Sequence, residues 1–189
     1  VSPWVVYTDT GNIWFKGGWH SRWLGMTTHP GKGSKLPLER SDEPQDSDYL
    51  CGCSILFRSE MLHNTGLLDE RYFIYTEDLD HSIRAKKLNW RICTVPGAIV
   101  SHGVSKSTGV NSTKHFSKIR AYYYSRNSIL SILWNENSRV RKISSLISQV
   151  IFVLPINLVR MVSEGTINFL PDYIKGMSDG FRGNSGRMK

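Results

Sequence analysis

The middle of the chain reads Gly66-Leu-Leu-Asp-Glu-Arg-Tyr-Phe-Ile-Tyr-Thr-Glu-Asp-Leu-Asp80, and this stretch decides the fold around it. It predicts an apolar and aromatic turn that leads into a helix starting after Thr76. Acidic residues (Glu77, Asp78, Asp80) crowd the first turn of this helix and basic residues lie towards its end, an order that suits the helix dipole. Asp80 and Arg84 stand four residues apart, so we expect them to pair on one helix face.

Asp78 is the residue of this stretch best suited to a catalytic role. Near a helix N-terminus, backbone N–H groups are expected to keep its carboxylate ionised. An ionised carboxylate in a fixed position can act as a general base towards a substrate hydroxyl. The alternative interpretation is that acids in a first helical turn simply stabilise the helix.

Short strands and loops are predicted on the N-terminal side of this stretch. Trp4–Tyr7 and Ile13–Phe15 are rich in β-formers and flank a turn, which predicts a hairpin. A long polar loop, Lys16–Ser47, follows, and Tyr49–Phe57 returns to strand composition. A short helix is expected over Arg58–His63, closed by Asn64-Thr65-Gly66. After the acidic helix, Trp90–Val95 and Ala98–Ser101 are predicted to be extended, with a break at Pro96-Gly97.

The C-terminal third is predicted to be helical and basic. Apolar residues recur along one face of a helix from Ile143 to Val162, and Arg139-Val-Arg-Lys142 approaches it. An apolar stripe beside basic residues is typical of a helix that lies in the interface of an anionic membrane. The alternative is an ordinary amphipathic helix packed on its own domain or on a second subunit, in a homo-oligomer.

Length and composition limit the classes of protein that fit. The 189 residues, 40% of them hydrophobic, suffice for a folded core and exclude a mainly disordered chain. A net charge of +8 favours anionic partners such as phosphorylated ligands or a membrane surface, but no nucleic-acid-binding signature accompanies it. Three cysteines without a disulfide pattern favour a cytoplasmic protein. Val1–Phe15 lacks the features of a signal peptide, and the apolar run Val150–Ile156 is too short to predict a membrane span.

Several motifs resemble the second half of family 2 glycosyltransferases, and within them the bacterial rhamnosyltransferase-like enzymes of surface polysaccharide synthesis. The resemblance starts at Tyr49-Leu50-Cys51-Gly52 and Arg58, and its main block is Gly66–Glu70 with Tyr72–Asp80. It continues through Arg84, Val95-Pro96, His102, Ser107, Gly109, His115 and Tyr123–Asn127, and covers about residues 3–130.

The resemblance implies an α/β protein with a partial GT-A (nucleotide-diphospho-sugar transferase) fold: a mixed sheet with flanking helices and a helical C-terminal extension. Residues 1–112 would form the acceptor and catalytic-base half of the GT-A domain, and residues 113–189 a basic helical extension. The family's N-terminal nucleotide-binding half would be missing, so the chain alone is expected not to transfer sugar.

The resemblance also implies a reaction and its residues. The reaction is an inverting transfer of a sugar, hexosyl or rhamnosyl, from a nucleotide diphosphate donor to a hydroxyl of a glycan or lipid-linked acceptor. Asp78 would be the base, with Glu77 and Asp80 shaping its site. His102 resembles a ligand for Mg²⁺ or Mn²⁺, although it could equally cap a strand end. Asp46-Ser47-Asp48 has the same residue pattern as the family's metal-binding Asp-x-Asp, but we interpret it as a solvated turn.

Acceptor binding is assigned to six residues: Trp19, Trp23, Tyr49, Gly52, Arg84 and Arg126. The aromatic rings would stack on sugars, although core packing is the commoner use of such rings. Arg126 belongs to a basic cluster that could face a lipid-linked diphosphate or simply solvent. A lipid-linked acceptor would place the protein in the cytoplasm, on the inner face of the plasma membrane. The alternative function is a non-catalytic carbohydrate-binding or membrane-docking module.

Overall fold

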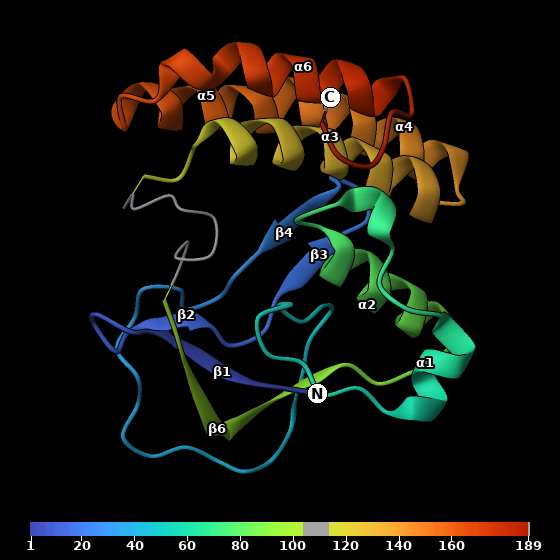
Figure 1. Ribbon diagram of the computed structural model, residues 1–189. Helices are drawn as coiled ribbons and strands as arrows, with labels where there is room; N and C mark the ends of the chain where they lie inside the picture. Colours follow the sequence, from blue (N-terminus) through green and yellow to red (C-terminus); the bar gives the residue numbers. More distant parts are fainter. Residues whose placement is uncertain (104–113, 189) are drawn as a thin grey trace. The chain divides into compact units, whose positions relative to one another are not determined.

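A four-stranded sheet forms the centre of the first half of the chain in the computed structural model (Figure 1). Its order is β2-β1-β6-β5, with β1 at Ser2–Tyr7, β2 at Ile13–Phe15, β5 at Gln45–Asp46 and β6 at Cys93–His102. β1 pairs antiparallel with β2, which confirms the predicted hairpin, and parallel with β6. The sheet is therefore mixed, as expected for an α/β protein.

The structure describes residues 1–103 and 114–188, and these residues divide into two units. The first unit contains Val1–His20, Thr27–Leu68 and residues 78–103. The second contains Ser21–Met26, Asp69–Glu77 and residues 114–188. The domain boundary predicted between residues 112 and 113, like Ser107 and Gly109 of the family resemblance, lies outside the described residues.

Strand β6 contains the interruption that the sequence predicts at Pro96-Gly97. Pro3 of β1 faces Val95, but the next residue, Trp4, faces Ile99, so β6 holds three extra residues at this point. A proline lacks the N–H that a ladder requires, and the extra residues form a bulge around it. The two predicted segments are thus one bulged strand that ends at His102.

Two helices complete the first unit. α1 (Ser59–Thr65) ends at Gly66, whose positive φ of 76° suits a residue without a side chain. α2 (Glu77–Lys87) carries the acidic first turn and the basic last turn that were predicted. Met61 of α1 and Ala85 of α2 pack with Leu50 and Ile92 in a buried cluster. This packing fixes α2 within the first unit.

Two predictions for the N-terminal half are wrong. Residues 49–57 form turns and irregular structure rather than a strand, because side chains of α2 take up the backbone donors: Leu50 N–H donates to Ser82 Oγ and Gly52 N–H to Asp78 Oδ2. The loop Lys16–Ser47 contains a small hairpin of β3 (Trp19–Ser21) and β4 (Met26–Thr28), as well as β5.

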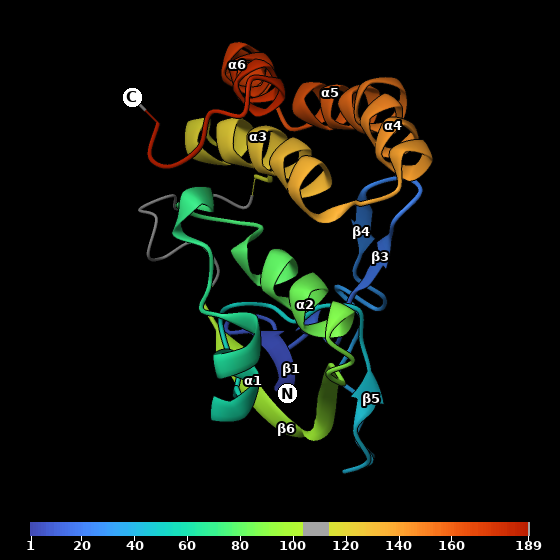
Figure 2. The ribbon, with the colours of Figure 1, turned by 90° about the vertical axis from the view of Figure 1, so that its right-hand side faces the viewer.

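The second unit is helical, as predicted. It contains α3 (Lys118–Asn135), α4 (Arg139–Ser148), a π-helical turn (Gln149–Val153), α5 (Leu154–Ser163) and α6 (Leu170–Phe181), with short 3₁₀ turns at Glu70–Tyr72 and Ile167–Phe169. Figure 2 shows these helices packed side by side. Their core contains Phe116, Ile129, Met161 and Tyr173, and Leu146 and Leu154 pack against it.

The residues from Arg139 to Ser163 form one continuous helix of 25 residues. This helix is long and apolar enough to cross a membrane, judged by length and composition. The sequence did not predict this, because the uninterrupted apolar run from Val150 to Ile156 is much shorter than the helix that contains it.

Candidate functional site

Asp78 lies in the first turn of α2, and two backbone amides hold its carboxylate. Gly52 N–H donates to Oδ2 at 2.9 Å, and the Leu79 N–H donates to Oδ1 at 2.8 Å. Burial raises the pKa of Asp78, and the hydrogen bonds from Gly52 and Leu79 only partly oppose this effect. Amide donors to the carboxylate are present as predicted, but their effect on its pKa is smaller than that of burial. A fixed carboxylate with a raised pKa is a better proton acceptor than an ordinary one.

Two cysteines lie beside this carboxylate. A hydrogen bond with Cys53, burial and the charge of Asp78 all raise the pKa of the Cys51 thiol. The same hydrogen bond lowers the pKa of Cys53. Cys53 is exposed and Cys51 is half-buried, and both are free thiols. The turn that contacts Asp78 therefore carries an accessible thiol whose pKa is lowered.

Asp80 and Arg84 form the predicted ion pair one turn further along α2. Arg84 Nε donates to Asp80 Oδ2 at 2.8 Å, and Asp80 is only 3% exposed. The guanidinium also donates to the carbonyl oxygens of Thr65 and Leu67. These contacts make Arg84 an anchor between α2 and the segment after α1, and leave its predicted role in acceptor binding without support.

Arg126 is the clearest correction among the predicted site residues. It is 1% exposed, in the interior of the second unit, and donates to the carbonyl oxygens of Gly186 at 2.6 Å and Tyr72 at 2.8 Å. Its guanidinium also lies over the ring of Tyr123, 4.7 Å from the centroid. A side chain enclosed in this way cannot contact an acceptor, so its role is structural.

The neighbouring Asn127 fixes the turn that directly precedes Glu77. Its amide donates to the carbonyl oxygens of Tyr72, Ile74 and Tyr75, at 3.1, 2.8 and 2.8 Å. Three non-glycine residues of this turn have positive φ: Phe73 at 67°, Tyr75 at 64° and Thr76 at 75°. Such angles are strained for residues with a side chain and persist only where the surroundings enforce them.

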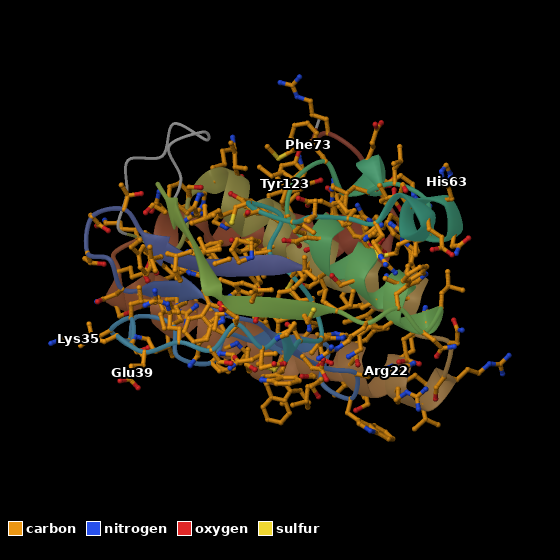
Figure 3. The ribbon with its side chains drawn as sticks, turned by 90° about the horizontal axis from the view of Figure 1, so that it is seen from below. Arg22, Lys35, Glu39, His63, Phe73 and Tyr123 are labelled. Atoms are coloured by element: carbon orange, nitrogen blue, oxygen red, sulfur yellow. The ribbon has the colours of Figure 1, made fainter. Side chains whose placement is uncertain are left out.

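Ring contacts also hold this turn within the second unit. The rings of Phe73 and Tyr123 lie side by side, with centroids 5.3 Å apart (Figure 3). Tyr75 packs on Tyr124 with centroids 4.5 Å apart. The segment that leads into Glu77 is thus fixed by hydrogen bonds and by stacking.

The three predicted aromatic contacts have different placements. Trp19, in β3, is 49% exposed, and Trp23, in the second unit, is 56% exposed, so both rings can meet a ligand. Tyr49 is only 5% exposed: its ring packs near Phe15 and its hydroxyl contacts His29. The stacking role predicted for Tyr49 is therefore wrong, because no ring face is free. Gly52 contributes its N–H to Asp78.

The described residues do not supply a complete metal site. His102 ends β6, and its ring packs against Trp14 with centroids 4.9 Å apart. No group of three or more His, Cys, Asp or Glu side chains gathers in the described part of the chain. Asp46 pairs with Arg91 and Asp48 with Lys86, while Ser47 is buried, so this segment is an anchored edge strand rather than a solvated turn. The predicted Mg²⁺ or Mn²⁺ thus has one candidate ligand here, His102, and we derive no step through it.

Sequence reasoning missed Asn127 and His81. His81 is buried in α2, where its Nε2 lies 3.1 Å from both Gly66 O and Thr65 Oγ1. Asn127 belongs to Tyr123–Asn127, a segment that the sequence singles out only through the family resemblance. An asparagine inside a predicted helix is unfavourable unless its amide has partners, and that conflict could have marked it.

Comparison with known proteins gives one partial likeness. Over 78 residues the chain is 38% identical to the N-acetylglucosaminyl-diphospho-decaprenol L-rhamnosyltransferase of Mycobacterium tuberculosis, in strains CDC 1551 and H37Rv alike. The matched part is related to a glycosyltransferase. It comprises 41% of this chain and 25% of the relative, so the match spans about a quarter of the length of these curated relatives. No protein family profile matches the chain.

Proposed function

We propose that this chain carries the catalytic base and acceptor side of an inverting glycosyltransferase with a GT-A, family 2 architecture. The substrates would be a nucleotide diphosphate sugar and a hydroxyl of a glycan or lipid-linked acceptor, in surface polysaccharide synthesis. One observation carries the proposal: the Asp78 carboxylate, in the first turn of α2, is held by two amides and has a raised pKa. The likeness to a rhamnosyltransferase supports the same class of reaction.

In the proposed step, Asp78 accepts the proton of the acceptor hydroxyl while that oxygen attacks the anomeric carbon of the donor. The new bond joins the acceptor oxygen to the sugar, the bond from the sugar to the diphosphate breaks, and the nucleotide diphosphate leaves with its electron pair. Attack from the face opposite the leaving group inverts the anomeric centre. The amides of Gly52 and Leu79 keep the carboxylate in one orientation throughout.

Residues around Asp78 would support this step without touching the reacting atoms. The Asp80–Arg84 pair anchors α2 on the segment after α1. Trp19 in the first unit is 49% exposed, so its ring is accessible to a sugar. Asn127 holds the turn that enters α2. A divalent cation, if bound, would neutralise charge on the leaving diphosphate.

Substitution of Asp78 by asparagine tests the assignment of the base. Sugar transfer would be measured with the protein that contains this chain, a nucleotide diphosphate L-rhamnose and an N-acetylglucosaminyl-diphospho-polyprenol, the chemistry named by the relative. We expect Asp78→Asn to lower kcat by about 10²- to 10⁴-fold, because the proton acceptor is lost. Glu39→Gln is the matched control, since Glu39 is exposed in the loop before β5 (Figure 3).

The outcomes separate the competing functions. A folded Asp78→Asn variant with near wild-type kcat would refute the role of Asp78. A wild-type protein that binds the acceptor glycan but transfers no sugar from any nucleotide sugar would instead support the non-catalytic carbohydrate-binding module. Circular dichroism of both variants verifies that the fold is intact.

A further inference from the structure

Most of the exposed side chains of the helix from Arg139 to Ser163 are apolar, although Leu146, Leu154 and Met161 of the same helix pack inward on the core of the second unit. Several of its polar side chains bond to the protein. Ser144 Oγ donates to Trp23 O at 2.9 Å, Ser145 Oγ to Arg22 O at 2.8 Å and Gln149 Nε2 to Gly25 O at 3.0 Å. Further along, Asn157 Nδ2 donates to the hydroxyl of Tyr173 at 3.0 Å. An amphipathic helix on a water-soluble surface exposes polar side chains instead.

The outward side chains form what we call the apolar helix face: Val140, Ile143, Ile147, Ile151, Ile156 and Val159. Each of these six is between 50% and 69% exposed. Four of the five steps between these residues are of three or four positions, but the step from Ile151 to Ile156 is five. The π-helical turn accounts for it, because Leu154 N–H donates to Gln149 O, five residues back. The turn therefore keeps α4 and α5 apolar on the same outer side.

A hollow beside this face is apolar as well. It has a volume of about 380 Å³ and is lined by Leu146, Ile147, Val150, Ile151 and Phe181, the last from α6. Contiguous exposed apolar surface of this kind marks an interaction site.

The charged side chains within the segment 139–163 are of one sign. The segment 139–163 contains four basic residues, Arg139, Arg141, Lys142 and Arg160, and no Asp or Glu. Glu136 and Glu164 flank this segment, and both bond to other groups of the protein. Glu136 forms ion pairs with Arg22 and Arg141, and Glu164 accepts a hydrogen bond from the His115 N–H. Arg141 is engaged with Glu136, and Lys142 Nζ donates to Leu133 O at 3.0 Å, so the exposed basic side chains of the rim are Arg139 near one end of the helix and Arg160 near the other.

We propose that the apolar helix face docks this chain onto the surface of an anionic lipid bilayer, with the helix lying in the interface plane. Acyl chains would cover the exposed isoleucines and valines, and anionic headgroups would meet the basic rim. A second copy of the chain is a poorer occupant, because its own rim would bring like charges together with no acid on the segment to pair with them.

A helix lying flat also fits better than one that spans the bilayer. The inner face of this helix is bonded to other protein groups from Ser144 to Asn157, and Leu146 and Leu154 pack on the core of the second unit. A spanning orientation would carry those protein layers into the hydrocarbon. The proposed docking would occur whether or not the chain transfers sugar, and it would bring the chain to the place where lipid-linked acceptors lie.

Sedimentation with lipid vesicles tests this proposal. The wild-type chain is expected to bind vesicles of phosphatidylcholine with phosphatidylglycerol, to bind pure phosphatidylcholine much less, and to lose binding as salt is raised. The triple variant Ile143→Gln, Ile147→Gln, Val159→Gln should bind roughly tenfold to a hundredfold more weakly, because three exposed apolar side chains no longer enter the bilayer. Leu38→Gln, at a side chain that is 97% exposed in the first unit, is the matched control and should bind like wild type.

Three results would overturn the proposal. The first is undiminished vesicle binding by a folded triple variant. The second is a wild-type dimer, by analytical ultracentrifugation, that the triple variant converts to a monomer while neither binds vesicles, which would assign the face to a second copy. The third is retention of the chain in cell membranes after extraction with alkaline carbonate, which would assign the helix to a bilayer span. Sugar-transfer activity enters none of these measurements, so they stand apart from the test of Asp78.

Discussion

Replacement of Asn127 by alanine should destabilise the protein far more than a surface substitution of the same kind. The Asn127 amide donates to three carbonyl oxygens of the turn before Glu77. Tyr72 O would keep a partner in the variant, because Arg126 also donates to it at 2.8 Å. Ile74 O and Tyr75 O accept from Asn127 at 2.8 Å each, and both oxygens would lose this bond in the variant.

The magnitude follows from those two carbonyl groups. Each buried polar group that loses its partner costs about 1–3 kcal/mol, so the loss of two such bonds in Asn127→Ala should lower the free energy of unfolding by about 2–6 kcal/mol. The turn also holds three residues at positive φ, each strained by about 1–3 kcal/mol, and part of that strain would be released as the turn relaxes. The relaxed turn would no longer hold Phe73, Tyr75 and Thr76 in these conformations.

Urea unfolding followed by circular dichroism measures this effect. Asn168→Ala is the control, since Asn168 is exposed in the same unit, and it should change stability by less than about 0.5 kcal/mol. Asn127→Asp adds a second readout: at neutral pH its carboxylate faces carbonyl oxygens, whereas protonation at low pH restores one donor. Its stability deficit should therefore shrink as pH falls. A loss below 0.5 kcal/mol for Asn127→Ala, or an Asn127→Asp deficit that does not vary with pH, would refute this account of the turn.

Two further predictions concern titratable groups. Burial opposes ionisation of Glu136, but hydrogen bonds from Arg141, the Ser138 amide and Arg22 prevail and lower its pKa to about 2. Because the pKa is lower in the folded state, ionised Glu136 stabilises the protein above the ordinary glutamate pKa, and this stabilisation is lost as pH falls from about 4.5 towards 2. Glu136→Gln should therefore have a free energy of unfolding about 1–2 kcal/mol below that of wild type at pH 7. Thermal unfolding measures this difference, which should disappear at pH 2. The lowered pKa of Cys53 predicts that iodoacetamide labels it before Cys51 and the buried Cys93, and that Cys51→Ala slows this labelling; peptide mass spectrometry that finds Cys51 labelled first would contradict the assignment.

Local signals in the sequence predicted the elements whose causes are local. The hairpin of β1 and β2, the short helix α1 and the acidic helix α2 follow from turn residues, a closing glycine and charge order, all within a few residues of each element. The ion pair of Asp80 with Arg84 follows from helical spacing alone. These predictions hold because the interactions that form each element come from residues close in the sequence.

Predictions failed where a distant partner decides the conformation. Residues 49–57 have strand composition, yet Ser82 and Asp78, about thirty residues away, take the N–H groups that a strand would need. Arg126 was predicted to bind the acceptor as part of a basic cluster, but the carbonyl oxygens of Tyr72 and Gly186 and the ring of Tyr123 enclose it. Composition records what a residue can bind and carries no information about which partner the fold brings to it.

The helix from Arg139 to Ser163 shows how distant partners also decide which side of a helix is exposed. Periodicity locates an apolar stripe, and the usual assumption is that the stripe faces the core. Here the fold supplies backbone carbonyls at Arg22, Trp23 and Gly25, and serine and glutamine side chains of the helix bond to them. These polar side chains pack inward beside Leu146, Leu154 and Met161, and other apolar side chains of the helix remain exposed. Isoleucine side chains that are 50% exposed or more have an unfavourable free energy in water. Contact with water alone does not explain their presence on this face. A bilayer surface removes that cost, and the bonded polar side explains why the helix would lie on the membrane instead of crossing it.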